Sequence, residues 1–149
     1  MNLVFLGPPG VGKGTQARVL AAQFGLTAVA TGDLIRAEVA AGTPMGCEAK
    51  KYIEAGNLVP DDVIIKMVEE LLARDNRQGF LLDGFPRTIP QAEGLDRMLR
   101  GLGRQVTASV CLVVAEEKVV QRLGNPRMCP VCSRVYNLLH QAPKVPGRC

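Results

Sequence analysis

A glycine-rich segment near the amino terminus constrains the fold of this chain more than any other feature. Residues 7–15 read Gly-Pro-Pro-Gly-Val-Gly-Lys-Gly-Thr, between an apolar run at residues 2–6 and apolar residues at helical spacing up to about Phe24. A strand, a glycine loop with lysine and a helix together are typical of a phosphate-binding loop. The glycines turn backbone N–H groups inward, the helix terminus adds partial positive charge, and Lys13 supplies a mobile cation. The hydroxyl comes at Thr15, one position later than in the general pattern, and an ordinary glycine-rich turn is the alternative interpretation.

The rest of the chain alternates short apolar runs with segments of helical periodicity. Further strands are expected over residues 27–30, 79–83 and 106–114. Helices are expected between them, with Thr31 as one N-cap and Thr88 opening a capping box with Gln91. This alternation predicts an α/β fold with a parallel sheet and helices on both faces.

Three regions are expected from these patterns. Residues 1–30 and 74–123 form the core that carries the phosphate-binding loop, and residues 31–73, which read as all helix, form a projecting lobe. From residue 124 to 149 the sequence turns to Pro, Gly, Cys and basic residues with little periodicity, which indicates a separate small lobe.

Composition limits the classes of partner. The chain of 149 residues is 47% hydrophobic and 21% charged, with a net charge of +4 that is too small and scattered to indicate nucleic acid binding. No apolar run approaches the roughly 20 residues that cross a bilayer, and no signal peptide is recognisable, so a cytoplasmic protein is expected. Of five cysteines, Cys47 and Cys111 are expected to be packing residues, whereas Cys129 and Cys132 form a CxxC pair that favours metal over a disulfide.

Three segments in order resemble the signatures of the adenylate kinase family, specifically its long form. They are GPPGVGKGTQA, TGDLIR at residues 31–36 and LLDGFPRT at residues 81–88, the last followed by Gln91. The resemblance covers essentially the whole chain. It implies a P-loop NTPase-type fold with a helical AMP-binding lobe and a lid. It also implies reversible phosphoryl transfer from ATP to AMP, giving two ADP, with Mg²⁺ accompanying ATP.

The resemblance also implies roles for individual residues. The expected catalytic residues are Lys13, Asp83, Arg87 and Arg122. ATP is expected at Gly10, Val11, Gly12, Lys13, Gly14, Thr15, Arg127, Val135 and Tyr136. AMP is expected at Thr31, Arg36, Asn57, Leu58, Val59, Gly84, Phe85, Pro86, Arg87 and Gln91.

Each of these polar residues has a purely structural alternative. Arg36 and Arg87 suit bidentate phosphate binding, but either could form a surface ion pair. Gln91 is both a candidate for base recognition and the third residue of a capping box. Asp83 is expected to orient Mg²⁺ through water or else to cap the following loop, and Arg122 is either a phosphate ligand or a solvated residue at a helix end.

The carboxyl-terminal segment resembles the zinc-bearing lid of many long-form members. Cys129, Cys132 and Cys149 are the expected ligands of a structural Zn²⁺, and a fourth ligand would be expected beyond Cys149, where the sequence stops. An unmetallated thiol pair is the alternative. Where the family pattern has Gly-Arg-Arg, this chain has Asn-Pro-Arg at residues 125–127, so Arg127 is expected to substitute for a phosphate-binding arginine. Because the family domain continues further, a carboxyl-terminally truncated chain of weak activity is expected, and a monomer if the chain is complete.

Two other functions remain open. One is a kinase for UMP or CMP, against which the long cysteine-bearing lid argues. The other is a non-catalytic fragment that binds nucleotides or zinc without turnover.

Overall fold

A computed structural model of the chain describes residues 1–75, 79–124, 126–131, 135–137, 142–143 and 145. The chain forms two compact units. The first comprises Met1–Leu6 and Gly14–Cys111, and the second comprises Gly7–Lys13 and Leu112–Cys149. In the described part of the chain, no helix combines the length and the apolar character that crossing a bilayer demands.

The first unit is built on a parallel sheet with the strand order β2-β3-β1-β4. The strands are β1 (Asn2–Leu6), β2 (Thr27–Ala30), β3 (Phe80–Asp83) and β4 (Ala108–Cys111). The predicted strands are therefore confirmed, although β4 is shorter than the apolar run at residues 106–114. The reason is that β1 ends at Leu6, which pairs with Cys111, so later residues have no partner in β1.

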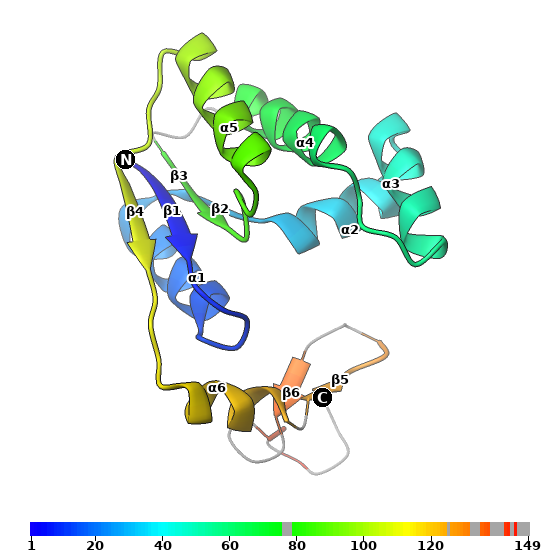
Figure 1. Cartoon of the computed structure of the whole chain (residues 1–149), viewed down its shortest axis with the longest axis vertical. Helices are drawn as coiled ribbons and strands as arrows, with labels where there is room; N and C mark the ends of the chain where they lie inside the picture. Colours follow the sequence, from blue (N-terminus) through cyan, green and yellow to red (C-terminus); the bar gives the residue numbers. More distant parts are fainter. Residues whose placement is uncertain (76–78, 125, 132–134, 138–141, 144, 146–149) are drawn as a thin grey trace. The chain divides into compact units, whose positions relative to one another are not determined.

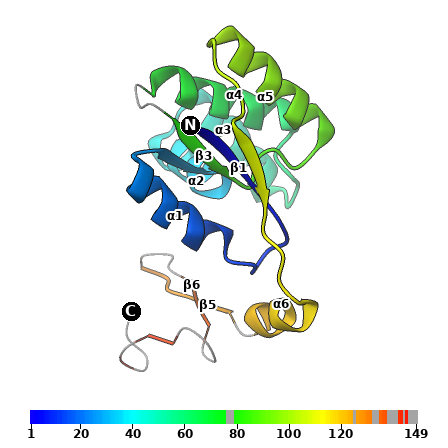
Figure 2. The ribbon, with the colours of Figure 1, turned by 90° about the vertical axis from the view of Figure 1, so that its left-hand side faces the viewer.

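Helices cover both faces of this sheet, as the sequence predicted (Figures 1 and 2). On one face, α4 (Asp61–Arg74) and α5 (Ile89–Gly101) pack over alternate strand residues. The resulting core contains Val4, Val29, Phe80 and Leu82 from the sheet, Val68 and Leu72 from α4, and Leu95, Met98 and Leu99 from α5. On the other face, α1 (Lys13–Phe24) buries only the small side chains of Ala17 and Ala21.

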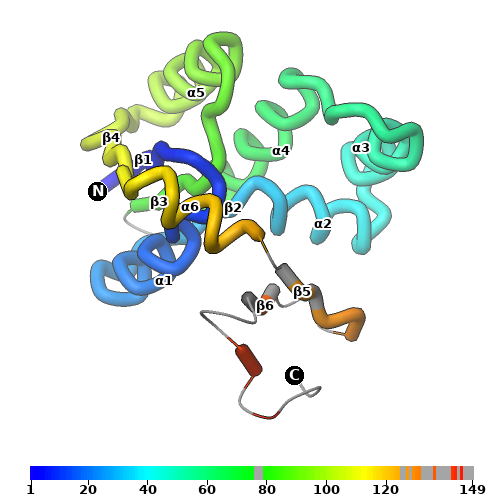
Figure 3. The backbone as a smooth tube through the Cα atoms, turned by 60° about the horizontal axis from the view of Figure 1, so that its bottom comes forward, coloured from blue at the N-terminus to red at the C-terminus, as the bar shows by residue number. Residues whose placement is uncertain are grey.

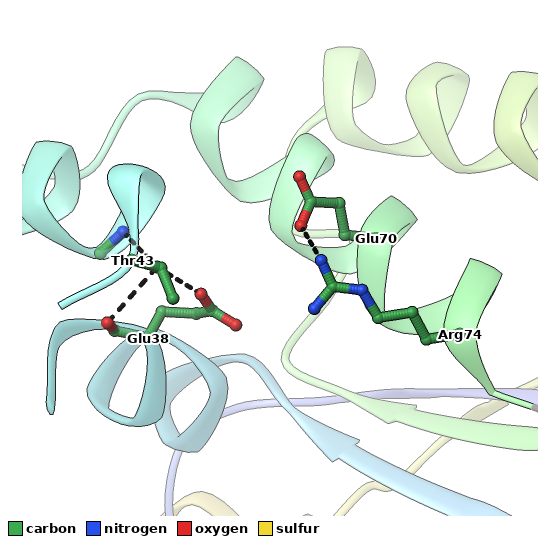
Figure 4. Close-up of polar contacts among 5 residues, drawn as sticks. Glu38, Thr43, Glu70 and Arg74 are labelled. Atoms are coloured by element: carbon green, nitrogen blue, oxygen red, sulfur yellow. Dashed lines mark hydrogen bonds and ion pairs between the residues drawn. The ribbon is translucent and has the colours of Figure 1, made fainter. Parts of the chain in front are cut away.

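Helices α2 (Thr31–Ala41), α3 (Pro44–Glu54) and the amino-terminal half of α4 pack around a small core of Ala49, Val63 and Met67, and Figure 3 shows the three helices. We call this part of the first unit the helical lobe; that it is a separate region stays a prediction. Gly42 ends α2 in the left-handed conformation. Thr43 then caps α3: its hydroxyl accepts from the Gly46 N–H at 3.0 Å and donates to the Glu38 carboxylate at 2.5 Å. Figure 4 shows this cap beside the Arg74–Glu70 ion pair on α4, which spans 2.8 Å.

The assignment of Thr31 as an N-cap was wrong. Thr31 is the first helical residue of α2, and Ala30 is the N-cap, without a side-chain hydrogen bond. Thr31 is buried, and its hydroxyl lies 3.4 Å from the Asp83 carbonyl oxygen, so it faces the end of β3 rather than its own helix.

The second unit contains α6 (Glu116–Leu123) and a two-stranded antiparallel hairpin. The hairpin pairs β5 (Pro126–Met128) with β6 (Val135–Asn137). It was not predicted from the sequence, because three-residue strands are too short to show alternation.

The prediction that Cys47 and Cys111 are packing residues was wrong, since both are exposed. Cys47 lies on α3 with its Sγ 3.6 Å from the Gly42 carbonyl oxygen. Cys111 ends β4, whose four residues are all exposed. An apolar sequence context was read as burial, but β4 is an edge strand and its side chains remain accessible.

Candidate functional site

The glycine-rich loop adopts conformations that require glycine at two positions. Gly7 has a φ of 133°, and a Cβ there would lie 2.5 Å from the Leu112 carbonyl oxygen. Gly10 has a φ of 79°, and a Cβ would lie 3.1 Å from the Leu123 side chain. The loop backbone therefore packs directly against the backbone at Leu112 and the side chain of Leu123, with no side chain of the loop between them.

Lys13 folds back over this loop. Its Nζ donates to the carbonyl oxygens of Gly7 at 2.8 Å and Pro8 at 2.9 Å. The ammonium group is thus held at the glycine loop by two neutral carbonyl acceptors. An anionic ligand would bind the ammonium group more strongly than these carbonyl oxygens do.

Arg122 contacts the same loop from α6. Its Nη1 lies 3.2 Å from the carbonyl oxygens of both Gly10 and Val11. Arg122 and Gly10 are 112 positions apart in the sequence, so the fold brings a second cation to the glycine loop. Arg122 is also exposed in the last turn of α6, as the alternative interpretation of a solvated arginine at a helix end expects.

The hairpin brings together the three remaining candidates for ATP binding. Arg127 of β5 pairs with Tyr136 of β6, and Met128 pairs with Val135. The Arg127 side chain is exposed and Tyr136 is half-buried.

Asp83 stands at the carboxyl end of β3, where parallel sheets bind ligands. Its Oδ2 lies 3.1 Å from the position that a Cβ on Gly14 would occupy, so a larger residue at Gly14 would crowd the carboxylate. Both residues line a cleft of about 490 Å³ that α1, β2 and the start of α2 also border. A carboxylate here and the exposed hydroxyl of Thr15 nearby in sequence are hard oxygen donors, which fits the chemistry that Mg²⁺ prefers.

The turn after β3 holds Arg87 against Gly84. Arg87 Nε donates to the Gly84 carbonyl oxygen at 2.7 Å, and a Cβ on Gly84 would lie 2.7 Å from Arg87 Nη2. Gly84 also has a φ of 81°. The guanidinium therefore lies directly over the glycine. The neighbouring Phe85 is buried and Pro86 half-buried.

The other candidates for AMP binding lie in the same unit. Arg36 pairs with Asp33 one turn earlier in α2, and both side chains are largely exposed. The surface ion pair considered from the sequence is therefore present. Between α3 and α4, the Asn57 N–H donates to the Tyr52 carbonyl oxygen at 2.8 Å, Val59 packs against the lobe core, and Leu58 is 93% exposed.

Gln91 has the most completely specified surroundings of any candidate residue. Its side chain is 3% exposed. Its backbone N–H donates to the Thr88 hydroxyl at 3.2 Å, which confirms half of the predicted capping box. The other half differs, because Gln91 Oε1 accepts from the Arg87 N–H at 2.8 Å rather than from that of Thr88.

Asp61 is the residue that sequence reasoning missed. Its carboxylate accepts from Gln91 Nε2 at 2.6 Å and from the Thr88 hydroxyl at 2.7 Å. An acidic residue in the first turn of a helix is stabilised by the helix dipole, and this local role indicates no partner on another helix. The sequence offers no signal that pairs it with residues 27 and 30 positions later.

The predicted zinc ligands are only partly described. Cys129 is half-buried, and Cys132 and Cys149 lie outside the described residues. Among the described residues, no group of three or more His, Cys, Asp or Glu side chains could hold a metal ion.

Comparison with known proteins identifies the family. A family model described as adenylate kinase matches residues 5–145. Adenylate kinase of Archaeoglobus fulgidus is 49% identical over all of this chain and 69% of its own length, and that of Geobacter sp. strain M21 is 49% identical over all of this chain and 70% of its own length. Adenylate kinase of Kosmotoga olearia is 49% identical over 97% of this chain and 67% of its own length. The chain therefore belongs to the adenylate kinase family.

Proposed function

We propose that this chain is a nucleoside monophosphate kinase that transfers a phosphoryl group reversibly between ATP and AMP, forming two ADP. Membership of the adenylate kinase family supports the activity. The observation that carries the substrate assignment is the turn after β3, where a carboxylate, a guanidinium and a buried amide follow one another at Asp83, Arg87 and Gln91.

ATP is assigned to the glycine loop and the hairpin. The backbone N–H groups of residues 10–15 would bind the phosphates, and Lys13 would exchange its two carbonyl acceptors for phosphate oxygens. Arg122, already at the loop backbone, would add positive charge where the transferring group develops negative charge. Arg127, Val135 and Tyr136 would contact the remainder of ATP.

AMP is assigned to the end of β3 and the helical lobe. Arg87 and Arg36 would bind its phosphate, and Arg36 would give up its exposed pairing with Asp33, which costs little. Gln91 would recognise the base. Thr31, residues 57–59 and Gly84 to Pro86 would line the rest of the site, and the exposed Leu58 would gain apolar contact from the nucleotide.

Mg²⁺ is the cofactor expected with ATP in this family. Asp83 and Thr15 are the residues that would hold it, Asp83 through water. When bound, the ion neutralises charge on the phosphate oxygens. The protein residues contribute positioning, since phosphoryl transfer needs the two nucleotides in line rather than a covalent intermediate.

The proposal is tested by ADP formation in a coupled assay with ATP and each of AMP, UMP and CMP, together with equilibrium binding. AMP should be the preferred acceptor. Lys13→Ala should abolish transfer and weaken ATP binding by roughly 10- to 100-fold, the scale of a charge-assisted contact, while leaving AMP binding largely intact. Preference for UMP or CMP would support the pyrimidine alternative. Tight binding of both nucleotides with no transfer would support a non-catalytic binder.

The lid is proposed to hold a structural Zn²⁺ through Cys129, Cys132 and Cys149, completed by a fourth ligand from elsewhere. The support is the CxxC spacing and the preference of Zn²⁺ for thiolates. Metal content of purified protein, before and after Cys132→Ser, tests this, and absence of zinc in the parent would reject it. The resemblance to the family also underlies three further parts of the proposal: a cytoplasmic location, a monomeric state if the chain is complete, and the division into core, AMP-binding lobe and lid.

A further inference from the structure

We propose that Asp61 is a positioning residue that determines purine selectivity, because its carboxylate fixes the orientation of the Gln91 amide. This inference rests on the proposed function, in which Gln91 recognises the base of AMP. It adds that the amino-terminal turn of α4 decides whether the site prefers a 6-aminopurine or a 6-oxopurine.

The contacts around Gln91 permit only one orientation of its amide. A carboxylate can only accept hydrogen bonds, so the group 2.6 Å from Asp61 Oδ1 must be the NH₂. A backbone N–H can only donate, so the atom 2.8 Å from the Arg87 N–H must be the carbonyl oxygen. If the amide were turned over, its NH₂ would face the Arg87 N–H, donor against donor. Its oxygen would face the Asp61 carboxylate, acceptor against acceptor.

Burial makes this constraint costly to break. The Gln91 side chain is 3% exposed, so water cannot replace a lost partner readily. The interaction with Asp61 is also charge-assisted, which makes it roughly twice as strong as a neutral hydrogen bond. Asp61 is held in turn by the Thr88 hydroxyl at 2.7 Å, which joins the first turns of α4 and α5.

Within the described residues, this network leaves the Gln91 amide one N–H and one oxygen lone pair for a ligand. Adenine presents an acceptor at N1 next to a donor at its 6-amino group, so it can receive the N–H and donate to the oxygen. Hypoxanthine presents the reverse pair, a donor at N1 and an acceptor at its 6-oxygen. A nucleotide anchored by its phosphate cannot turn its base over to exchange these two edges.

It follows that discrimination between AMP and IMP depends on an amide that cannot rotate. Without Asp61, the Arg87 N–H would be the one hydrogen-bond partner among the described residues that opposes rotation of the Gln91 amide. The rotated amide would match IMP, so the preference for AMP should shrink even though no group that contacts the nucleotide has been removed.

The experiment measures Kd for AMP and for IMP by calorimetry in the full chain and in Asp61→Ala. The ratio of Kd for IMP to Kd for AMP should fall by about tenfold, the scale of one buried hydrogen bond. The matched control is Asp62→Ala, which removes a neighbouring exposed carboxylate from the same first turn of α4. Asp62→Ala should leave the ratio unchanged, because the Gln91 amide keeps its hydrogen bond to Asp61. Both variants lose the same helix-dipole contribution, so that contribution cannot account for a difference between them.

Asp61→Asn serves as the near-isosteric variant should the alanine variant fail to fold. Asparagine can accept from Gln91 only through one neutral oxygen, and it can also rotate its own amide, so the ratio should fall at least about threefold. Urea unfolding of every variant separates loss of selectivity from loss of stability.

Three results would overturn the inference. If the parent chain binds AMP and both Asp61 variants keep the parent's ratio of Kd for IMP to Kd for AMP, the role of Asp61 is rejected and the proposed function stands. Equal weakening of AMP and IMP shows a structural role for Asp61 only. A parent chain that binds neither nucleotide rejects the proposed function, and this inference falls with it.

Discussion

Gly84 links backbone geometry to the candidate site at the scale of a single residue. Its φ of 81° lies in the left-handed region, and the space where a Cβ would stand is occupied by the guanidinium of Arg87. Arg87 can donate to the Gly84 carbonyl oxygen only because no side chain intervenes. The position of the arginine therefore depends on the absence of a neighbouring methyl group.

Gly84→Ala should lower stability and weaken AMP binding together. The positive φ costs about 1–2 kcal/mol for a non-glycine residue. Displacement of Arg87 should remove a charge-assisted contact with AMP, worth about 1.5–3 kcal/mol. Urea unfolding and AMP calorimetry measure the two effects.

Gly103→Ala is the matched control for Gly84→Ala. Gly103 has a φ of 63°, and nothing lies within 4 Å of the position of its Cβ. This variant should show the conformational cost and normal AMP binding. If Gly84→Ala binds AMP as tightly as Gly103→Ala does, Arg87 does not depend on the glycine.

Helices α2 and α3 are in close backbone contact at Gly46, and this contact restrains the geometry of the helical lobe. A Cβ on Gly46 would lie 2.0 Å from the Glu38 carbonyl oxygen, which is backbone and cannot rotate away. The same Glu38 accepts from Thr43, the N-cap of α3. One short turn thus combines a helix cap with a close helix crossing, so the two helices cannot adjust independently.

At the scale of the element, Gly46→Ala should destabilise the chain by about 3 kcal/mol or more, the upper range for overpacking. Gly101→Ala places the same methyl group in α5 with nothing within 4 Å, and should be neutral or stabilising by about 0.5 kcal/mol. Chemical denaturation of both variants checks the difference. Equal stability of the two variants would mean that the α2–α3 crossing tolerates a methyl group.

The whole molecule divides its candidate residues between two units. The glycine loop up to Lys13 belongs with Arg122 and the hairpin, whereas Asp83, Arg87 and Gln91 belong with the sheet and the helical lobe. In the described part of the chain, β4 ends the sheet with one edge unpaired, and its residues are exposed. Such an edge offers N–H and C=O groups to another chain.

Residues 1–149 expressed as given should therefore self-associate as concentration rises, and Val110→Lys should reduce this association. Val110 is 41% exposed on β4, and a charge there opposes strand addition. Val19→Lys on α1, where the valine is 57% exposed, adds the same charge away from the edge. Sedimentation velocity over a concentration series compares them. Equal effects of the two lysines would indicate general charge repulsion instead of pairing at β4.

The sequence by itself determined the order of strands and helices in the first unit, the parallel α/β class and the glycine loop. These follow from local signals: apolar runs, helical periodicity, and residues such as Gly42, Thr43 and Thr88 that act within a few positions of themselves. The cap of α5 at Thr88 was predicted for this reason.

Only the tertiary structure decided which distant residues meet. Thr31 faces Asp83 instead of capping α2, Arg122 reaches the loop of Gly10, and Asp61 holds Gln91 across 30 positions. No local pattern encodes these contacts, because each depends on how strand order and helix packing bring separate segments together. The exposure of Cys111 has the same origin: an apolar run fixes the tendency to form a strand, but the place of that strand at the edge of the sheet fixes what its side chains contact.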